Sequence, residues 1–143
     1  MTETPFTAAM FTPTKFDTAA DKAKFANHLV RFVHSDFNRN LFPKWFYNRL
    51  SMTFGHIAHF NINGFYGVHF ASDGARLDWL RLVANAPAFG DPAYTYSDVE
   101  RALAAWVKDS GLIPGYVERI AAARETAERA ELARLKAKYE PTS

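Results

Sequence analysis

Cysteine is absent from this chain of 143 residues. Its absence excludes disulfide bonds, thiolate nucleophiles and every zinc site that contains cysteine, and it fits a reducing compartment. Long hydrophobic runs are also missing, because charged residues, asparagine or histidine interrupt every stretch that approaches the roughly 20 residues needed to span a bilayer. The first residues carry no basic segment ahead of an apolar one, unlike a secretory signal. We therefore expect a cytoplasmic protein without a membrane partner.

Motifs for nucleophilic catalysis and phosphate binding are absent as well. The sequence contains no G-x-S-x-G elbow, no Walker loop and no G-x-G-x-x-G turn. Four of the six serines stand where helix caps or turns are expected, namely Ser35, Ser72, Ser97 and Ser110. The expectation is a protein that is not an enzyme and that holds no cofactor.

Charge is nearly balanced overall but uneven along the chain. Seventeen Lys and Arg residues against fifteen Asp and Glu give a net charge of +2, which excludes a polycationic tail and a charge-driven disordered protein. Residues 22–81 hold eight of the basic residues and only three acids, and twelve of the 22 aromatic residues lie between Phe25 and Phe70. The overlap of aromatic and basic residues indicates either an aromatic core or a binding surface.

Hydrophobic periodicity predicts a mainly helical domain. Apolar residues recur at helical spacing over residues 18–34 and 43–54. Ser72 starts a third helical pattern, and Ser97 with Glu100 three residues later forms a capping box for a fourth. The length of the chain fits one compact domain.

The segment IAHFNINGFYGVHF (residues 57–70) predicts a β-hairpin. Asn63-Gly64 is the preferred pair for a type I′ turn, and residues that favour strands flank it. A two-residue loop would pair Ile62 with Phe65. The expected fold is therefore four to five helices around an aromatic-rich core with one hairpin, which is mainly α, or α+β by strict counting.

Three regions are expected along the chain. Residues 1–16 lack a sustained period and predict an irregular arm, whereas residues 17–123 predict a single globular domain. Pro114 suits the first turn of a last helix, and residues 124–143, rich in alanine and charge, predict a projecting helical tail. A thin apolar strip on this tail consists of Leu132, Leu135 and Tyr139. It leaves two interpretations open, a solvated helix or a contact with a second copy of the chain or another partner.

The segment RNLFPKWFYNRL (residues 39–50) interleaves cations with aromatic residues. On a helix, Trp45, Phe46 and Leu50 are expected to point inward. The polar and aromatic residues left over, with one tyrosine of the predicted hairpin, are the candidate binding residues: Arg39, Lys44, Tyr47, Asn48, Arg49 and Tyr66. Such residues suit the hot spots of a protein or nucleoprotein partner. Direct binding of nucleic acid by the basic aromatic region 39–70 is the alternative, through base stacking and phosphate contacts.

Histidines offer a further alternative, a metal-dependent enzyme. His56 and His69 would lie diagonally on one face of the predicted hairpin. A first-row metal would need a third ligand such as Asp73, and no carboxylate stands at a spacing that compels this. The favoured interpretation is therefore that these histidines hold no metal.

Three blocks of sequence resemble small uncharacterised accessory proteins of bacterial plasmids and phages. They are FPKWFYNRLSMTFGHIAHFNINGFYGVHF, GDPAYTYSDVERAL and ERAELARLKAKY. The resemblance supplies no catalytic motif. It implies a mobile-element binding protein that regulates or inhibits host nucleic-acid machinery, such as a defence nuclease.

Overall fold

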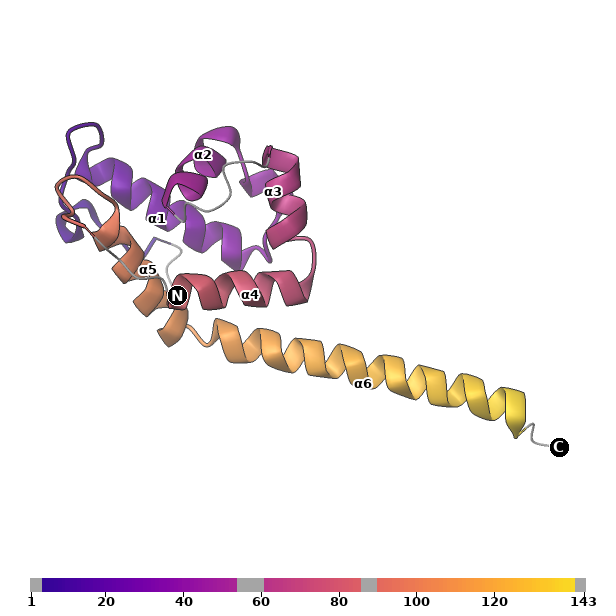
Figure 1. The fold of residues 1–143 in the computed structure, drawn as a ribbon. Coiled ribbons are helices and arrows are strands. Elements are labelled where there is room, and N and C mark those ends of the chain that lie inside the picture. Colours follow the sequence, from indigo (N-terminus) through magenta and orange to yellow (C-terminus); the bar gives the residue numbers. More distant parts are fainter. Residues whose placement is uncertain (1–3, 54–60, 86–89, 141–143) are drawn as a thin grey trace.

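The computed structural model describes residues 4–53, 61–85 and 90–140, which form six α-helices and two short 3-10 helices. No strand occurs in these ranges (Figure 1). The α-helices are α1 (Ala19–His34), α2 (Lys44–Thr53), α3 (Ile62–His69), α4 (Asp73–Ala84), α5 (Ser97–Asp109) and α6 (Leu112–Tyr139). The 3-10 helices are η1 (Ala8–Met10) and η2 (Arg39–Leu41).

A cluster of aromatic rings around Phe32 of α1 forms the centre of the core. The ring centroid of Phe32 lies 5.0 Å from that of Phe70, 5.3 Å from that of Phe37 and 5.4 Å from that of Phe42. Phe46 of α2 joins the cluster at 5.6 Å. These tilted and edge-on arrangements are the ones that aromatic pairs prefer, because the positive ring edge meets the negative ring face. Much of the aromatic excess therefore serves packing.

The predicted hairpin at residues 57–70 is wrong, since Ile62–His69 is the helix α3. The Asn61 side chain accepts a hydrogen bond of 2.6 Å from the backbone N–H of Gly64 and so caps the helix. Asn63-Gly64 lies in the first turn of α3 and Phe65 is buried. Residues 57–60 lie outside the described residues. The described part of the chain is thus all-helical, with no α+β character.

The predicted helices are present and one predicted cap is wrong. The helices predicted over residues 18–34 and 43–54 are α1 and α2, each within one residue of the predicted ends, and Ser72 caps the start of α4 as predicted. At α5, however, Tyr96 is the cap residue and Ser97 is already in the helix. The Ser97 hydroxyl donates instead to the carbonyl of Gly90, at 2.9 Å. The buried serine therefore fixes the preceding loop rather than capping the helix.

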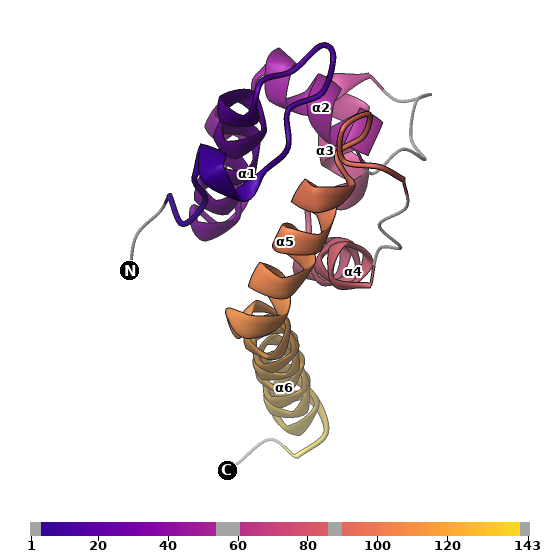
Figure 2. The same ribbon diagram turned by 90° about the vertical axis from the view of Figure 1, so that its left-hand side faces the viewer.

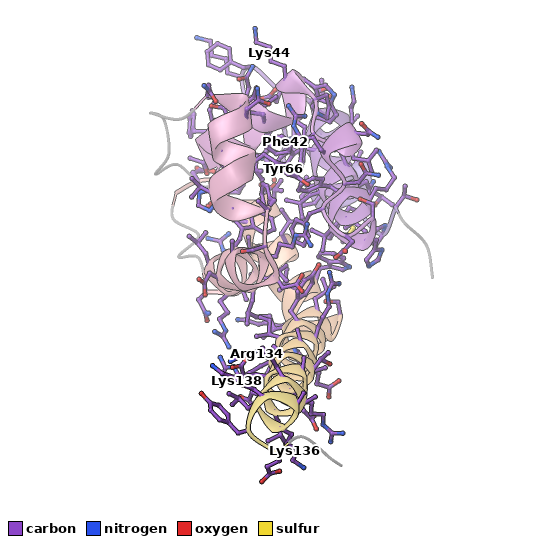
Figure 3. The ribbon with its side chains drawn as sticks, turned by 90° about the vertical axis from the view of Figure 1, so that its right-hand side faces the viewer. Phe42, Lys44, Tyr66, Arg134, Lys136 and Lys138 are labelled. Atoms are coloured by element: carbon purple, nitrogen blue, oxygen red, sulfur yellow. The ribbon has the colours of Figure 1, made fainter. Side chains whose placement is uncertain are left out.

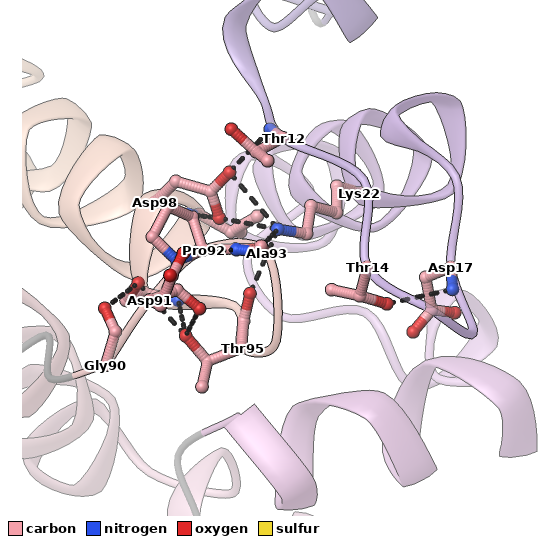
Figure 4. Close-up of polar contacts among 12 residues, drawn as sticks. Thr12, Thr14, Asp17, Lys22, Gly90, Asp91, Pro92, Ala93, Thr95 and Asp98 are labelled. Carbon is pink, nitrogen blue, oxygen red and sulfur yellow. Dashed lines mark hydrogen bonds and ion pairs between the residues drawn. The ribbon is translucent and has the colours of Figure 1, made fainter.

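A buried lysine joins the N-terminal arm, α1 and the loop before α5 (Figure 4). Lys22 is fully buried, and its ammonium donates to the carbonyls of Pro92 (2.8 Å) and Thr95 (3.0 Å) and to Asp98 Oδ1 (2.9 Å). Asp98 also accepts from the backbone N–H of Thr12, at 2.9 Å. Every proton of this buried cation has an acceptor. Lys22 therefore holds the loop before α5 directly and the N-terminal arm through Asp98.

Helix α6 leaves the rest of the molecule after its first turns (Figures 1 and 2). It begins after Gly111, whose φ of +77° is readily reached only by glycine. Tyr116 is buried near its start, whereas residues 121–140 are all exposed. The 28 residues of α6 correspond to ~42 Å at 1.5 Å per residue. The apolar strip near its end is exposed, and homo-oligomerisation through it stays a prediction.

A charge cluster holds the start of α6 against the segment between α1 and η2. The Arg119 guanidinium donates two hydrogen bonds of 2.9 Å to the Asp36 carboxylate and also pairs with Asp73. The Tyr116 hydroxyl donates to Asp36 at 2.6 Å. The hydrogen bonds from Arg119 lower the pKa of Asp36 from its usual 3.8 to about 2.

Asp36→Asn should destabilise the protein by about 1 kcal/mol or less at neutral pH, because the pair it disrupts is half exposed. Asparagine tolerates the positive φ of 63° at this position, so the variant removes charge with little backbone strain. Since the folded-state pKa is depressed, the contribution is present above about pH 4 and is lost as the pH falls towards 2. Urea unfolding should therefore separate the two proteins at pH 7 and not at pH 2; a difference that persists in acid would contradict the assignment.

Deleting residues 124–143 should change the free energy of unfolding by no more than about 0.5 kcal/mol, because the described residues of this segment bury no side chain. Circular dichroism should show the loss of the corresponding helical signal, and chemical unfolding should give an unchanged midpoint. A lowered midpoint would mean that the distal part of α6 contributes contacts to the folded state.

Candidate functional site

Two of the predicted binding residues connect η2 to α3. The Arg39 guanidinium donates to the carbonyl of Phe42 at 3.0 Å and to the Asn63 side chain at 2.9 Å. The Tyr66 hydroxyl donates to the carbonyl of Phe37. Both side chains thus make intramolecular contacts that fix α3.

The other four predicted residues lie along α2. Tyr47 is half-buried, with its ring 5.4 Å from that of Phe65. Arg49 faces away from α3, towards the N-terminal arm. Lys44 and Asn48 are exposed, and Figure 3 shows Lys44 reaching outward at the end of the molecule opposite the tip of α6. The structure therefore brings Arg39, Tyr47 and Tyr66 together around the Phe42 ring and places Arg49 beside Asp17.

Of the two histidines that the metal alternative requires, His69 lies within the described residues and His56 lies outside them. His69 is half-buried with its ring 4.9 Å from that of Phe65, and burial lowers its pKa. Among the described residues, no group of three or more His, Asp or Glu side chains is arranged to hold a metal ion.

The prediction that Trp45 points inward is wrong. Its side chain is 40% exposed, and its ring packs against the buried His28 imidazole at 4.9 Å. The Lys24 ammonium lies 4.7 Å from the ring centroid. Because neighbouring residues on a helix point about 100° apart, Phe46 takes the position towards the core and Trp45 stays at the surface.

Two adjoining hollows lie beside α2, with cavity volumes of about 420 Å³ and 250 Å³. Asp17, Arg49 and Tyr96 line both hollows. The larger one is enclosed by the N-terminal arm, α2 and the segment from Tyr94 into α5, and the smaller one by α1 and α2. We call the two together the aromatic groove.

Four exposed apolar side chains line the aromatic groove. Phe16 is 87% exposed, Tyr94 79%, Met52 70% and Trp45 40%. They come from the arm, the loop before α5 and the two ends of α2. Exposed apolar residues gathered around a hollow are typical of an interaction site, and aromatic residues and methionine are the types enriched in protein interfaces.

The charges in the groove are mostly paired. Arg49 lies 3.1 Å from the Asp17 carboxylate, and its guanidinium carbon lies 4.3 Å from the Tyr96 ring centroid. Burial is the main cause that raises the pKa of Tyr96 to about 12, so its hydroxyl stays protonated. Asp21 accepts hydrogen bonds from Thr18 at the start of α1, which lowers the Asp21 pKa.

Glu100 is the exception among these charges. It lines the larger hollow and is half-buried. Burial raises its pKa, an effect that the charge of neighbouring Arg101 opposes. No hydrogen bond or ion pair joins its carboxylate to another residue in the described part of the chain. The groove can therefore accept apolar side chains at its rim and offers one carboxylate inside.

The sequence interpretation missed Phe16, Met52, Tyr94 and Glu100. Phe16 and Tyr94 stand in segments without helical period, where no core stripe accounts for a large aromatic residue. That mismatch is the signal that could have identified them, although only the fold brings them together.

A larger hollow, of about 560 Å³, lies between the end of α4 and α5. The described residues of its lining include Ala104 and Ala105 with the polar Asn85, Arg101 and Lys108, and none of them is a large apolar residue. The described lining therefore offers no anchoring residue of the kind found in the aromatic groove.

None of the described helices combines the length and the apolar character needed to cross a membrane. The aromatic groove contains the residue types that are enriched in protein interfaces. Comparison of the chain with protein-family models, with curated proteins and with solved structures finds no match.

Proposed function

We propose that this chain is a non-enzymatic binding protein that engages a protein partner through the aromatic groove. The observation that carries the proposal is the convergence of four exposed apolar side chains, from three separate parts of the chain, around two adjoining hollows. Leaving such side chains in water forgoes the burial energy that a partner would supply.

Hydrogen bonds that hold the backbone of the loop and of the arm beside the groove support this role. The Lys22 hydrogen bonds hold the loop that carries Tyr94, and the Thr12 contact to Asp98 holds the arm that leads to Phe16. A backbone that is already in position loses little conformational freedom when a partner binds. The groove is therefore suited to a partner whose surface matches a fixed shape.

A protein partner fits the charges better than direct contact with nucleic acid does. Phosphate binding needs cations that are free to replace counterions. Of the three Lys and Arg residues in region 39–70, Arg39 and Arg49 already make intramolecular contacts and only Lys44 is exposed. The larger hollow carries two carboxylates against one guanidinium. The resemblance to accessory proteins of plasmids and phages further implies that the partner belongs to host nucleic-acid machinery, a defence nuclease for example.

Affinity purification from the native host, with and without nuclease treatment, tests the proposal. The bait is compared with Phe16→Ala/Tyr94→Ala, which removes two groove anchors, and with Tyr139→Ala, which removes a similarly exposed tyrosine from the far end of α6. We expect a protein that resists nuclease, binds the wild-type chain and Tyr139→Ala, and is lost with the groove variant.

Two results would contradict the proposal. Capture that disappears with nuclease would support direct nucleic-acid binding instead. Capture that survives in the groove variant but fails in Tyr139→Ala would place the contact on α6.

A further inference from the structure

We infer that the partner segment that enters the aromatic groove presents a lysine or arginine side chain to Glu100. The inference rests on the proposed function, because it specifies the chemistry of the segment that the groove accepts. It concerns the larger hollow, where Glu100 lies with Phe16, Met52 and Tyr94.

Glu100 lies in the wall of the larger hollow. It is the fourth residue of α5, and its side chain is half-buried in the wall of a hollow of about 420 Å³. Such a volume lies in the range of sites that enclose small ligands, about 300–1,000 Å³. A side chain of a partner can therefore enter the hollow and reach the carboxylate.

Among the described residues, no ion pair or hydrogen bond reaches the Glu100 carboxylate. The charge of neighbouring Arg101 acts on it, but Arg101 lines the hollow between α4 and α5. Arg49, the cation that lines the same hollow, is committed to Asp17 and to the Tyr96 ring. Lys22 beneath the loop is fully buried and bound to Asp98. Among the described residues these cations are matched, whereas the Glu100 carboxylate has no ion pair.

Two further cations lie near the groove. Lys15 on the arm has its ammonium 5.7 Å from the Phe16 ring centroid, and Lys24 covers Trp45. Both ammonium groups are on aromatic rings at the rim, and neither residue lines the larger hollow. Within that hollow, the unmatched charge is negative.

The rim of the larger hollow matches a long cationic side chain. Lysine and arginine carry apolar stems that pack on hydrophobic surface while the charged end reaches a polar partner. Phe16, Met52 and Tyr94 provide the apolar contact, the two rings also attract a cation through their faces, and Glu100 accepts a charge-assisted hydrogen bond. An acidic segment would instead meet Glu100 with like charge.

Selection of a phage-displayed library of random peptides of about 12 residues, on the full-length protein, tests the inference. We expect the enriched peptides to share a lysine or arginine next to an apolar residue. A synthetic peptide from this set should lose affinity by about 10-fold or more when its basic residue is replaced by methionine, or when the protein carries Glu100→Gln. Glu118→Gln, at an exposed site on α6, is the matched control and should bind as the wild type does.

An NMR titration with the same peptide supplies a second readout. Because burial without a partner raises the pKa of Glu100, a cation that pairs with it should lower that pKa. An unchanged Glu100 pKa in the complex would overturn the inference even where the peptide binds.

The outcomes separate the inference from the proposed function. Peptides that depend on Phe16 and Tyr94 but lack a common basic residue, or that bind Glu100→Gln equally well, overturn the inference and leave the proposed function standing. Peptides that bind regardless of Phe16→Ala/Tyr94→Ala contradict both. Failure to enrich any peptide at the groove also counts against the inference.

Discussion

Lys22→Ala should lower the free energy of unfolding by about 3–5 kcal/mol, the cost of removing one partner from a buried ion pair. The substitution leaves the Asp98 carboxylate, 15% exposed, without its cation and the carbonyls of Pro92 and Thr95 without their donor. A small domain has only about 5–15 kcal/mol of stability in total. The variant should therefore unfold at a temperature about 10 °C or more below the wild type.

Thermal and urea unfolding measure this effect, with Lys44→Ala as the control. Lys44 is exposed at the start of α2, so its removal should cost no more than about 0.5 kcal/mol. A double-mutant cycle of Lys22→Met and Asp98→Asn adds a second check, because residues that share a buried pair should show a coupling of about 1 kcal/mol or more. Independent effects of the two substitutions would show that the pair does not hold the loop.

Phe16→Ala/Tyr94→Ala should weaken binding of the purified partner by about 30-fold or more. Alanine substitution of an aromatic hot-spot residue costs about 2 kcal/mol or more, and a factor of ten corresponds to 1.4 kcal/mol. Both side chains are largely exposed in the free protein, so the free energy of unfolding should stay within about 0.5 kcal/mol of the wild type. The loss is then a loss of contact and not of folding.

Titration calorimetry of the partner into each variant measures the dissociation constants. Tyr139→Ala should give the wild-type value, because this tyrosine is the last residue of α6. The C-terminal end of α6 lies far from α2 (Figure 1). Wild-type affinity in the double variant would show that the partner does not bind through the aromatic groove.

The helices with strong apolar period could be predicted from the sequence. In α1, Phe25, Leu29 and Phe32 repeat at helical spacing and are buried together. In α3, by contrast, the run around Asn63-Gly64 is short and aromatic, and a short apolar run fits a strand or a helix equally well. The Asn61 cap and the burial of Phe65 decide in favour of the helix, and both depend on the rest of the fold.

The sequence alone marks Lys22 as unusual, although the helix prediction did not consider it. It precedes Phe25 by three residues and Leu29 by seven, which places it on the apolar stripe of α1. A lysine at such a position needs a buried carboxylate or carbonyl oxygens close by. Asp98, 76 residues away, could not be identified as that partner from spacing.

The aromatic groove could not be predicted from the sequence, because it depends on tertiary structure. Arg49 was predicted as a binding residue, but its pairing with Asp17 and Tyr96 makes it part of the wall. The exposed anchors Phe16 and Tyr94 stand 78 positions apart in segments without period. Only the packing of the arm and the loop on α1, fixed by Lys22, brings them to one hollow.

Site-specific photocrosslinking shows which part of the molecule contacts a partner. A benzoylphenylalanine is placed at Met52, in the groove, or at Tyr139, near the end of α6; both residues are about 70% exposed. Irradiation in the native host should crosslink a protein partner from position 52 and not from position 139. A crosslink formed only from position 139, or one to nucleic acid from position 52, would contradict a protein-binding role for the aromatic groove.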